Sequence, residues 1–171
     1  MCRTPQHVFN SPEPDRHSGA GRKACVWPHT WVVTEPNSAA ANDDLRRVLS
    51  HLYPPVTVSS DNAARLVSGF ATFTPQPEHA GAPEWMQGGL SATVLDYVAA
   101  RIANQALSSK VATGTLDLRY RRPVLLTGGP YRVEGSAPIA GGRTTRVRAA
   151  ILSSDGRPLV EASALFVAVD V

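Results

Sequence analysis

The sequence predicts an α+β fold in which one antiparallel sheet wraps around a hydrophobic helix. An apolar helical segment starts at about Gly88, four strand-like segments follow it, and short turn signals separate these strands. Short links favour antiparallel pairing, and a helix that is apolar on most of its surface is expected to be buried. At 171 residues the chain has the length of one domain.

Composition and local patterns exclude several classes of protein. Hydrophobic residues make up 43% of the chain and charged residues 18%, which excludes intrinsic disorder of the whole chain. No apolar run is long enough to cross a membrane, and the N-terminus lacks the apolar core of a secretory signal. We therefore expect a cytoplasmic location and no membrane partner. Cys2 and Cys25 lack metal-ligand spacing, so no metal site is expected.

The first third of the chain is predicted to be an extension of the main domain. Residues 1–40 are polar and rich in Pro, Gly, Ser and Arg, which is typical of a flexible tail and linker. Residues 41–57 are predicted to contain a helix that Asn42 caps and Pro54 ends. Its apolar stripe would consist of Leu45, Val48, Leu49 and Leu52. The remaining residues, 58–171, would form the main domain.

Within that domain, the pattern predicts one strand, one long loop, one helix and four more strands. The first strand spans 64–74, and the loop over 75–89 is rich in Pro and Gly. A lone histidine in this loop, His79, is expected to be solvated, with a place in the wall of the pocket as the alternative. The buried helix runs from about Gly88 to Ser108 or Ser109. The later strands span about 111–122, 130–139, 143–153 and 158–169, with turn signals at 127–129, 140–142 and 153–156.

Positive charge is concentrated in the later strands. Residues 110–157 contain nine lysines and arginines and three acids, a local net charge of +6 in a chain with a net charge of +3. Such a segment attracts polyanions or a phosphate-bearing cofactor, although a solvated sheet face has the same composition. The basic residues are not interleaved with aromatic residues, which make up 6% of the chain, so no nucleic-acid partner is expected.

The most distinctive segment is the start of the buried helix, WMQGGLSATVLD over residues 85–96. Gly88 and Gly89 open the helix, so their N–H groups have no intrahelical acceptor and lie at the positive end of the helix dipole. Glycine also allows a ligand to approach the backbone closely. This arrangement suits an anion or a developing oxyanion.

Asp96 is an unusual residue for the middle of an apolar helix. If buried, it requires a partner or a chemical role, whereas the alternative is that it faces a solvent groove or caps a loop. Nine residues separate Asp96 from Gln87, which corresponds to about 13.5 Å along a helix and about 180° around it. The two side chains of one helix therefore cannot meet on one substrate atom. If both act on one substrate, the sites are shared between two subunits.

The segments QGGLSATVLD and TGTLDLRYRRPV resemble the hotdog-fold acyl-CoA thioesterases, most closely the phenylacetyl-CoA and 4-hydroxybenzoyl-CoA thioesterase branch. That branch typically reads HGG-x-x-A-x-x-x-D, followed by a strand of the form T-x-x-L-x-x-x-Y-x-R-P, and the likeness covers about residues 60–169. The resemblance implies hydrolysis of an acyl thioester. Gly88 and Gly89 would polarise the carbonyl, Asp96 of a partner subunit would be the general base or nucleophile, and Thr113 would orient the water.

The resemblance also implies a substrate that carries coenzyme A or phosphopantetheine, no other required cofactor, and a homodimer or a dimer of dimers. Arg119, Arg121, Arg122 and Arg143 would be the residues available to bind the phosphates. Alternation places Arg119 and Arg121 on one face of the strand and Arg122 on the other.

One position departs from the family pattern, because Gln87 stands where the family usually has His. Gln can donate a hydrogen bond through its amide but cannot transfer protons. Two alternatives to hydrolysis therefore remain open. One is a hotdog protein that binds acyl thioesters without hydrolysing them, and the other is an enzyme of the same fold that carries out a dehydration or a cyclisation.

Overall fold

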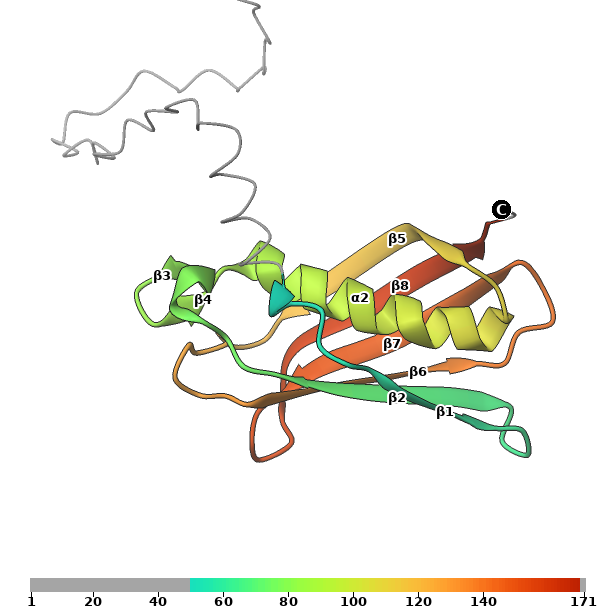
Figure 1. Cartoon of the computed structure of the whole chain (residues 1–171), viewed down its shortest axis with the longest axis horizontal. Helices are drawn as coiled ribbons and strands as arrows, with labels where there is room; N and C mark the ends of the chain where they lie inside the picture. Colours follow the sequence, from blue (N-terminus) through green and yellow to red (C-terminus); the bar gives the residue numbers. More distant parts are fainter. Residues whose placement is uncertain (1–49, 170–171) are drawn as a thin grey trace, which may run out of the picture. The chain divides into compact units, whose positions relative to one another are not determined.

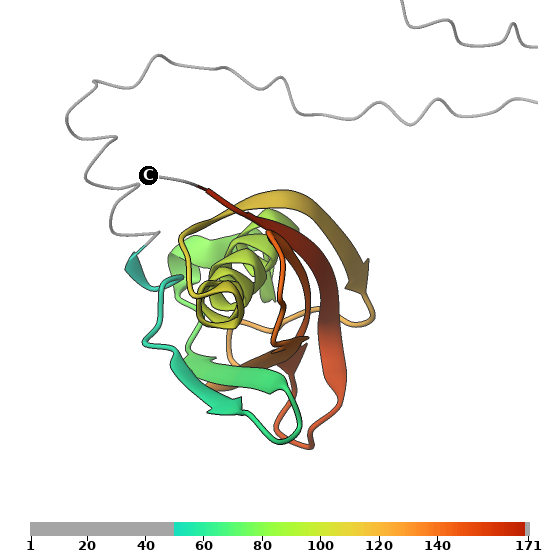
Figure 2. The same ribbon diagram turned by 90° about the vertical axis from the view of Figure 1, so that its right-hand side faces the viewer.

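A computed structural model of the protein describes residues 50–169. Six strands form one antiparallel sheet, and a single long helix lies across it (Figure 1). In the view along the helix, the sheet curves around it (Figure 2), which confirms the predicted α+β fold. The strands are β1 (Thr57–Asp61), β2 (Leu66–Phe73), β5 (Val111–Tyr120), β6 (Tyr131–Pro138), β7 (Thr144–Leu152) and β8 (Pro158–Ala168), and the helix is α2 (Gly88–Leu107).

The start and end of α2 agree with the prediction, and both ends have capping interactions. Gln87 is the N-cap, and its side-chain Oε1 accepts a hydrogen bond from the Leu90 N–H at 3.0 Å. At the other end Ser108 adopts the left-handed conformation with φ of 51°, and Ser109 N–H bonds back to the Asn104 carbonyl. These caps satisfy backbone groups that a helix leaves without internal partners.

The core lies between α2 and the concave face of the sheet. The fully buried side chains of α2 at this interface include Val94, Leu95, Val98 and Ile102. They pack against alternate residues of the strands, among them Val133, Val147, Ile151 and Phe166. Each of these larger side chains stabilises the fold by about 1.5–3 kcal/mol through burial. The predicted alternation in 143–153 is confirmed, because Val147, Ala149 and Ile151 are buried while Arg146 and Arg148 are exposed.

Strand order corrects one expectation. The turn signal at 127–129 suggests that the strands now identified as β5 and β6 form a hairpin, but the order in the sheet is β1-β2-β6-β7-β8-β5. The connection over residues 121–130 is instead held at its start and in its middle. The N–H groups of Arg121 and Arg122 bond to the Leu159 carbonyl, and Leu126 N–H bonds to the Glu84 carbonyl. Among residues 50–169, strand β5 therefore forms one edge of the sheet and pairs with β8 alone.

Two further features were not predicted. The short strand β1 is polar and mostly exposed, so it has little hydrophobic periodicity. The loop over 75–89 contains a 3-10 turn, η1 (Pro77–His79), and a small hairpin of β3 (Ala80–Ala82) and β4 (Trp85–Met86). In the N-terminal extension, the described residues begin at Ser50, so the predicted tail and most of the predicted first helix lie outside them.

The hydroxyl of Tyr131 ties the 121–130 connection to β6. It accepts a hydrogen bond from the Leu125 N–H at 3.1 Å and donates one to the Leu125 carbonyl at 3.0 Å. Burial raises the pKa of Tyr131, and the hydrogen bond from the backbone of Leu125 partly opposes this effect. The phenol is therefore protonated at neutral pH, as the hydrogen bond to the carbonyl requires.

We expect Tyr131→Phe to lower the free energy of unfolding by about 1 kcal/mol, because both hydrogen bonds to Leu125 are lost. A phenol with a raised folded-state pKa contributes stability below its unfolded pKa and loses it as pH rises through the folded value. The difference between variant and wild type should thus shrink in strongly alkaline buffer. Urea unfolding at neutral and alkaline pH measures both effects, and equal stability at neutral pH would contradict the assignment.

Candidate functional site at the N-terminus of helix α2

The backbone places Gly88 and Gly89 at an open helix end. Strand β4 leads directly into α2, and the Gln87 N–H bonds to the His79 carbonyl at 2.8 Å. Within residues 50–169, neither Gly88 N–H nor Gly89 N–H bonds to a protein acceptor, whereas the Leu90 and Ser91 N–H groups bond to Gln87. Two adjacent donors at the positive end of the helix dipole are thus left available for a ligand.

The Gln87 side chain lies beside these donors. A Cβ atom placed on Gly89 would be 3.0 Å from Gln87 Oε1 and 3.3 Å from Nε2, so the carboxamide is next to Gly89. The capping bond with Leu90 occupies Oε1, and this leaves the amide N–H₂ as the donor end of the side chain. Gly81 in β3 permits this arrangement, since a Cβ there would be 2.8 Å from the Gln87 Cα.

A pocket of about 300 Å³ opens beside Gly88. Its walls include Trp85 and Tyr120, which are 50% and 54% exposed, and the Tyr120 hydroxyl donates a hydrogen bond to the Gly88 carbonyl at 2.8 Å. The other lining residues are Met86, Ser91, Arg121, Arg122, Pro123, Val124 and Val160. The pocket therefore joins the open helix end to an apolar wall and to two of the arginines singled out in the sequence.

Asp96 lies further along the same helix, half-buried, and has a defined partner. The hydroxyl of Thr113 in β5 donates a hydrogen bond to Asp96 Oδ1 at 2.9 Å. The two residues singled out separately in the sequence are thus in contact. Eight residues along α2 separate Asp96 from Gly88, or about 12 Å. Within one chain, the carboxylate and the glycine N–H groups cannot reach the same atom of a substrate.

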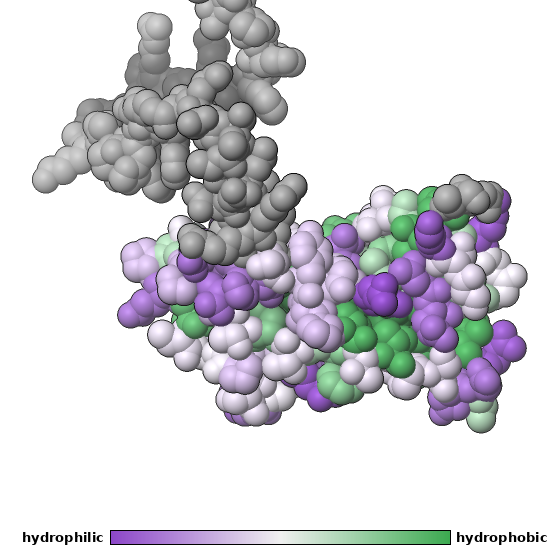
Figure 3. All heavy atoms as spheres, in the orientation of Figure 1, coloured by the Kyte–Doolittle hydropathy of each residue, from purple (hydrophilic) through white to green (hydrophobic). Residues whose placement is uncertain are grey.

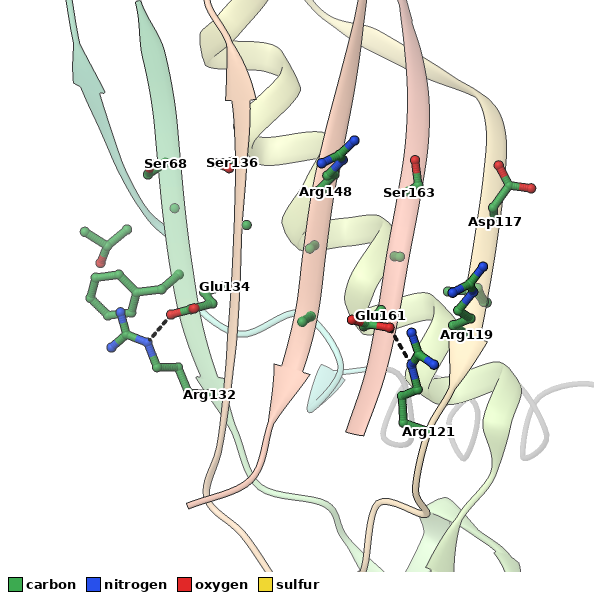
Figure 4. Close-up of a pocket in the computed structure, with 18 of the residues that line it drawn as sticks. Ser68, Asp117, Arg119, Arg121, Arg132, Glu134, Ser136, Arg148, Glu161 and Ser163 are labelled. Atoms are coloured by element: carbon green, nitrogen blue, oxygen red, sulfur yellow. Dashed lines mark hydrogen bonds and ion pairs between the residues drawn. The ribbon is translucent and has the colours of Figure 1, made fainter. Parts of the chain in front are cut away.

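The four arginines are not brought together. Arg119 and Arg121 lie on the outer face of the sheet, where they line a groove of about 1,040 Å³ (Figure 4). Arg121 also lines the smaller pocket, together with Arg122. Arg143 is at the opposite end of the sheet, where its Nη2 is 3.5 Å from the Ala168 carbonyl oxygen. A strand of ten residues, about 30 Å long, separates the two ends.

Charges of both signs alternate in the outer groove. Arg121 Nε is 2.7 Å from Glu161 Oε2, and Arg132 Nε is 3.0 Å from Glu134 Oε2 (Figure 4). These side chains are about half exposed, and such pairs contribute little to stability. For the outer face, the solvated-sheet interpretation of the basic segment is the better supported one. Arg121 and Arg122 remain the arginines adjacent to Gly88.

Two residues near the site differ from expectation or were missed. His79 is fully buried, so the expectation that it is solvated is wrong. Its Nδ1 accepts the Gln76 N–H, and its carbonyl accepts the Gln87 N–H, so it supports the loop that leads into α2. Tyr120 was given no role from the sequence, although it is the Tyr of the strand pattern T-x-x-L-x-x-x-Y-x-R-P and alternates with Leu116 and Leu118 in β5. Between residues 50 and 169 no group of three or more His, Cys, Asp or Glu side chains is arranged to hold a metal ion.

Comparison of the sequence with protein-family models gives no match, and neither does comparison with curated proteins. Solved structures do match. A thioesterase superfamily protein is 29% identical with a TM-score of 0.54, over 67% of this chain and 56% of that one. The chain thus spans little more than half the length of that protein.

Two further solved structures align over most of their own length. A Bacillus halodurans protein crystallised with CoA is 17% identical with a TM-score of 0.55, over 80% of this chain and 83% of that one. A phenylacetic acid degradation-related protein from Ralstonia eutropha JMP134 is 21% identical with a TM-score of 0.54, over 71% of this chain and 89% of that one. The chain has the hotdog-like fold of the thioesterase superfamily structures. None of the helices between residues 50 and 169 has the length and apolar character needed to span a membrane.

Proposed function

We propose that the protein is a thioesterase that hydrolyses an acyl thioester of coenzyme A or of a carrier-bound phosphopantetheine. The observation that carries the proposal is the pair of N–H groups of Gly88 and Gly89, which have no acceptor among residues 50–169 and lie beside a pocket in a hotdog-like fold. Donors at a helix N-terminus stabilise the negative charge that develops on a thioester oxygen. The fold is shared with a protein crystallised with CoA, which supports this substrate class.

In the proposed reaction, the thioester carbonyl oxygen is bound by the two glycine N–H groups. Asp96 takes a proton from water as the water oxygen attacks the carbonyl carbon, and the negative charge moves to the carbonyl oxygen. The C–S bond then breaks, Asp96 returns its proton to the sulfur, which leaves as a thiol, and a carboxylic acid forms. In the alternative reaction path, the Asp96 carboxylate itself attacks the carbonyl carbon. This step releases the thiolate and gives an anhydride, which water then hydrolyses. In both reaction paths, the hydroxyl of Thr113 holds the Asp96 carboxylate by a hydrogen bond.

This chemistry requires Asp96 from a second copy of the chain. Pairing of two copies along strand β5 would place that Asp96 beside Gly88 and Gly89. Strand β5 is an edge of the sheet, with Thr113 near its start and Tyr120 at its end. If two β5 edges pair antiparallel, the start of each strand lies beside the end of the other. Asp96 and Thr113 of one copy would then lie beside Gly88 and Tyr120 of its partner. We therefore propose a homodimer with two composite sites.

The face of α2 that points away from the sheet is consistent with such a partner. Its side chains Ala92, Tyr97 and Ala100 are only partly covered. In the space-filling view of this side, hydrophobic residues gather in the region of α2 between hydrophilic surroundings (Figure 3). Partly covered apolar residues beside an unpaired strand edge are common at interfaces between copies of one chain.

A direct assay tests both parts of the proposal. We expect the full chain to release free thiol from at least one member of a panel of aromatic and aliphatic acyl-CoA esters, in proportion to enzyme concentration. Sedimentation equilibrium at micromolar concentration should give at least a dimer. Absence of turnover on the whole panel would overturn the hydrolase, and an active monomer would overturn the composite site.

The Gln87 side chain favours a second candidate, a protein that binds acyl thioesters without hydrolysing them. Its Oε1 is held by the helix cap, and its amide donates hydrogen bonds but cannot transfer protons. In this case the same assay would show no thiol release, while titration calorimetry with the same CoA esters would show binding. Turnover that depends on Asp96 would exclude this candidate.

A further inference from the structure

The hydrogen bond from Tyr120 to Gly88 is not needed to satisfy the helix. In an α-helix the carbonyl of residue 88 already accepts the N–H of residue 92, so the phenol is a second donor to the same oxygen. Tyr120 is also 54% exposed, and its hydroxyl could be satisfied by water instead. The side chain nevertheless reaches from the end of β5 to the first turn of α2, and its O–H donates to the carbonyl oxygen at 2.8 Å.

This carbonyl belongs to the same peptide unit as the Gly89 N–H. The peptide group is planar, so whatever fixes the Gly88 C=O also fixes the direction of the Gly89 N–H. Hydrogen bonds along one peptide unit polarise one another, and two donors on the oxygen make the N–H at the other side of the plane a stronger donor. Two successive glycines leave this plane freer to rotate than other residues would, so the hydrogen bond from Tyr120 adds a second restraint to that of the residue 92 N–H.

The neighbouring peptide unit gives an internal comparison. Between Gly89 and Leu90, the carbonyl accepts the Thr93 hydroxyl at 3.0 Å and the N–H bonds to Gln87 Oε1 at 3.0 Å, so both ends are used by the protein. Between Gly88 and Gly89, the carbonyl is held by Tyr120 while the N–H has no acceptor within the described residues. Of these two peptide units, the one between Gly88 and Gly89 is fixed and also open to a ligand.

The ring of Tyr120 also packs directly on Gly88. A Cβ atom on Gly88 would lie 3.4 Å from Tyr120 Cε1 and 3.5 Å from its hydroxyl oxygen. The aromatic ring and the glycine are thus in close contact in the wall of the 300 Å³ pocket. The hydroxyl can be removed while this packing is kept, which makes its role separable from that of the ring.

We propose that Tyr120 is a positioning residue, whose hydroxyl orients and polarises the Gly88–Gly89 peptide so that the Gly89 N–H binds the thioester oxygen. The inference rests on the proposed thioesterase function. It assigns to a β5 residue a role in the reaction that acts entirely through the backbone of α2. Tyr120 itself does not contact the reacting atoms.

The test uses Tyr120→Phe in the full chain, with Tyr53→Phe as the matched control. Tyr53 is 46% exposed, its ring packs on Tyr97, and it has no role in the proposed site. We expect Tyr120→Phe to lower kcat by about tenfold with little change in KM, because an oxyanion donor acts mainly in the transition state. Tyr53→Phe should retain the wild-type kcat.

A spectroscopic readout separates positioning from a merely structural role. With a ¹³C-carbonyl acyl-CoA bound to the non-hydrolysing Asp96→Asn variant, infrared difference spectra report the strength of hydrogen bonding to the thioester oxygen. Adding Tyr120→Phe should move the carbonyl stretch back toward its frequency in solution. An unchanged kcat would overturn the inference and leave the thioesterase intact. So would a lower kcat with an unchanged carbonyl stretch. A wild type that hydrolyses no thioester would overturn the proposed function itself.

Discussion

Replacement of Asp96 by Asn is expected to lower kcat for thioester hydrolysis by about 10²–10⁴-fold, with a smaller change in KM. The carboxylate is the group of the proposed site that can accept a proton from water or attack the thioester, and an amide does neither. Asn keeps the size of the side chain and can still accept the hydrogen bond that Thr113 now donates to Asp96. Detection of free thiol under saturating substrate measures the loss.

The matched control is Asp117→Asn. Asp117 lies on the same strand as Thr113 but on the outer face of the sheet, where it lines the large groove and not the pocket beside Gly88. The substitution removes one carboxylate and should leave kcat unchanged. If Asp96→Asn retained the wild-type kcat, the carboxylate would be neither base nor nucleophile, and the proposed mechanism would fail.

The composite site can be examined with two inactive variants. A copy with Asp96→Asn lacks the carboxylate half of the proposed site. A copy with Gly89→Val lacks the glycine half. After mixing and exchange of subunits, each heterodimer regains one complete site, so about a quarter of wild-type activity should return. No recovery despite demonstrated exchange would place both halves of the site in one chain.

The sequence predicts the elements that have one apolar face packed in the core. Helix α2 and strands β5 to β8 lie within a few residues of their expected bounds, because apolar periodicity of 3.6 or 2 residues is a local signal. Glycine signals also placed the ends of these strands correctly. The contact between Asp96 and Thr113 was not itself predicted, but both residues were singled out on separate grounds.

Features that depend on distant parts of the chain could not be predicted in this way. Strand β5 pairs with β8 rather than β6, and the 121–130 connection bonds to Leu159 and Glu84, contacts that no local pattern encodes. His79 is buried and bonds to Gln76 and Gln87, contacts that a lone histidine in a loop sequence does not reveal. The arginines belong to one basic segment of the sequence, yet the lengths and directions of the strands distribute them over opposite ends and faces of the sheet.

A pair of strand glycines carries a second large expected effect. Gly69 and Gly135 are directly opposite each other in β2 and β6, and both lie beneath Ile102 of α2. A Cβ atom on Gly135 would be 2.7 Å from the Arg148 carbonyl oxygen and 3.1 Å from Ile102 Cδ1. We expect Gly135→Ala to lower the free energy of unfolding by about 3 kcal/mol, because the nearest atom belongs to the backbone of β7 and cannot move independently.

Gly141→Ala is the control for Gly135→Ala, since no atom lies within 4 Å of the added Cβ in the turn between β6 and β7. Thermal and urea unfolding of both variants compare a crowded glycine with an open one. A Gly135→Ala protein as stable as the wild type would mean that the Arg148 carbonyl of β7 and the Ile102 side chain of α2 can both give way without cost. Any shift of α2 also matters for the proposed site, because α2 carries Gly88, Gly89 and Asp96 together. A helix displaced at Ile102 should also lose the contact between Asp96 and Thr113, and with it the proposed activity.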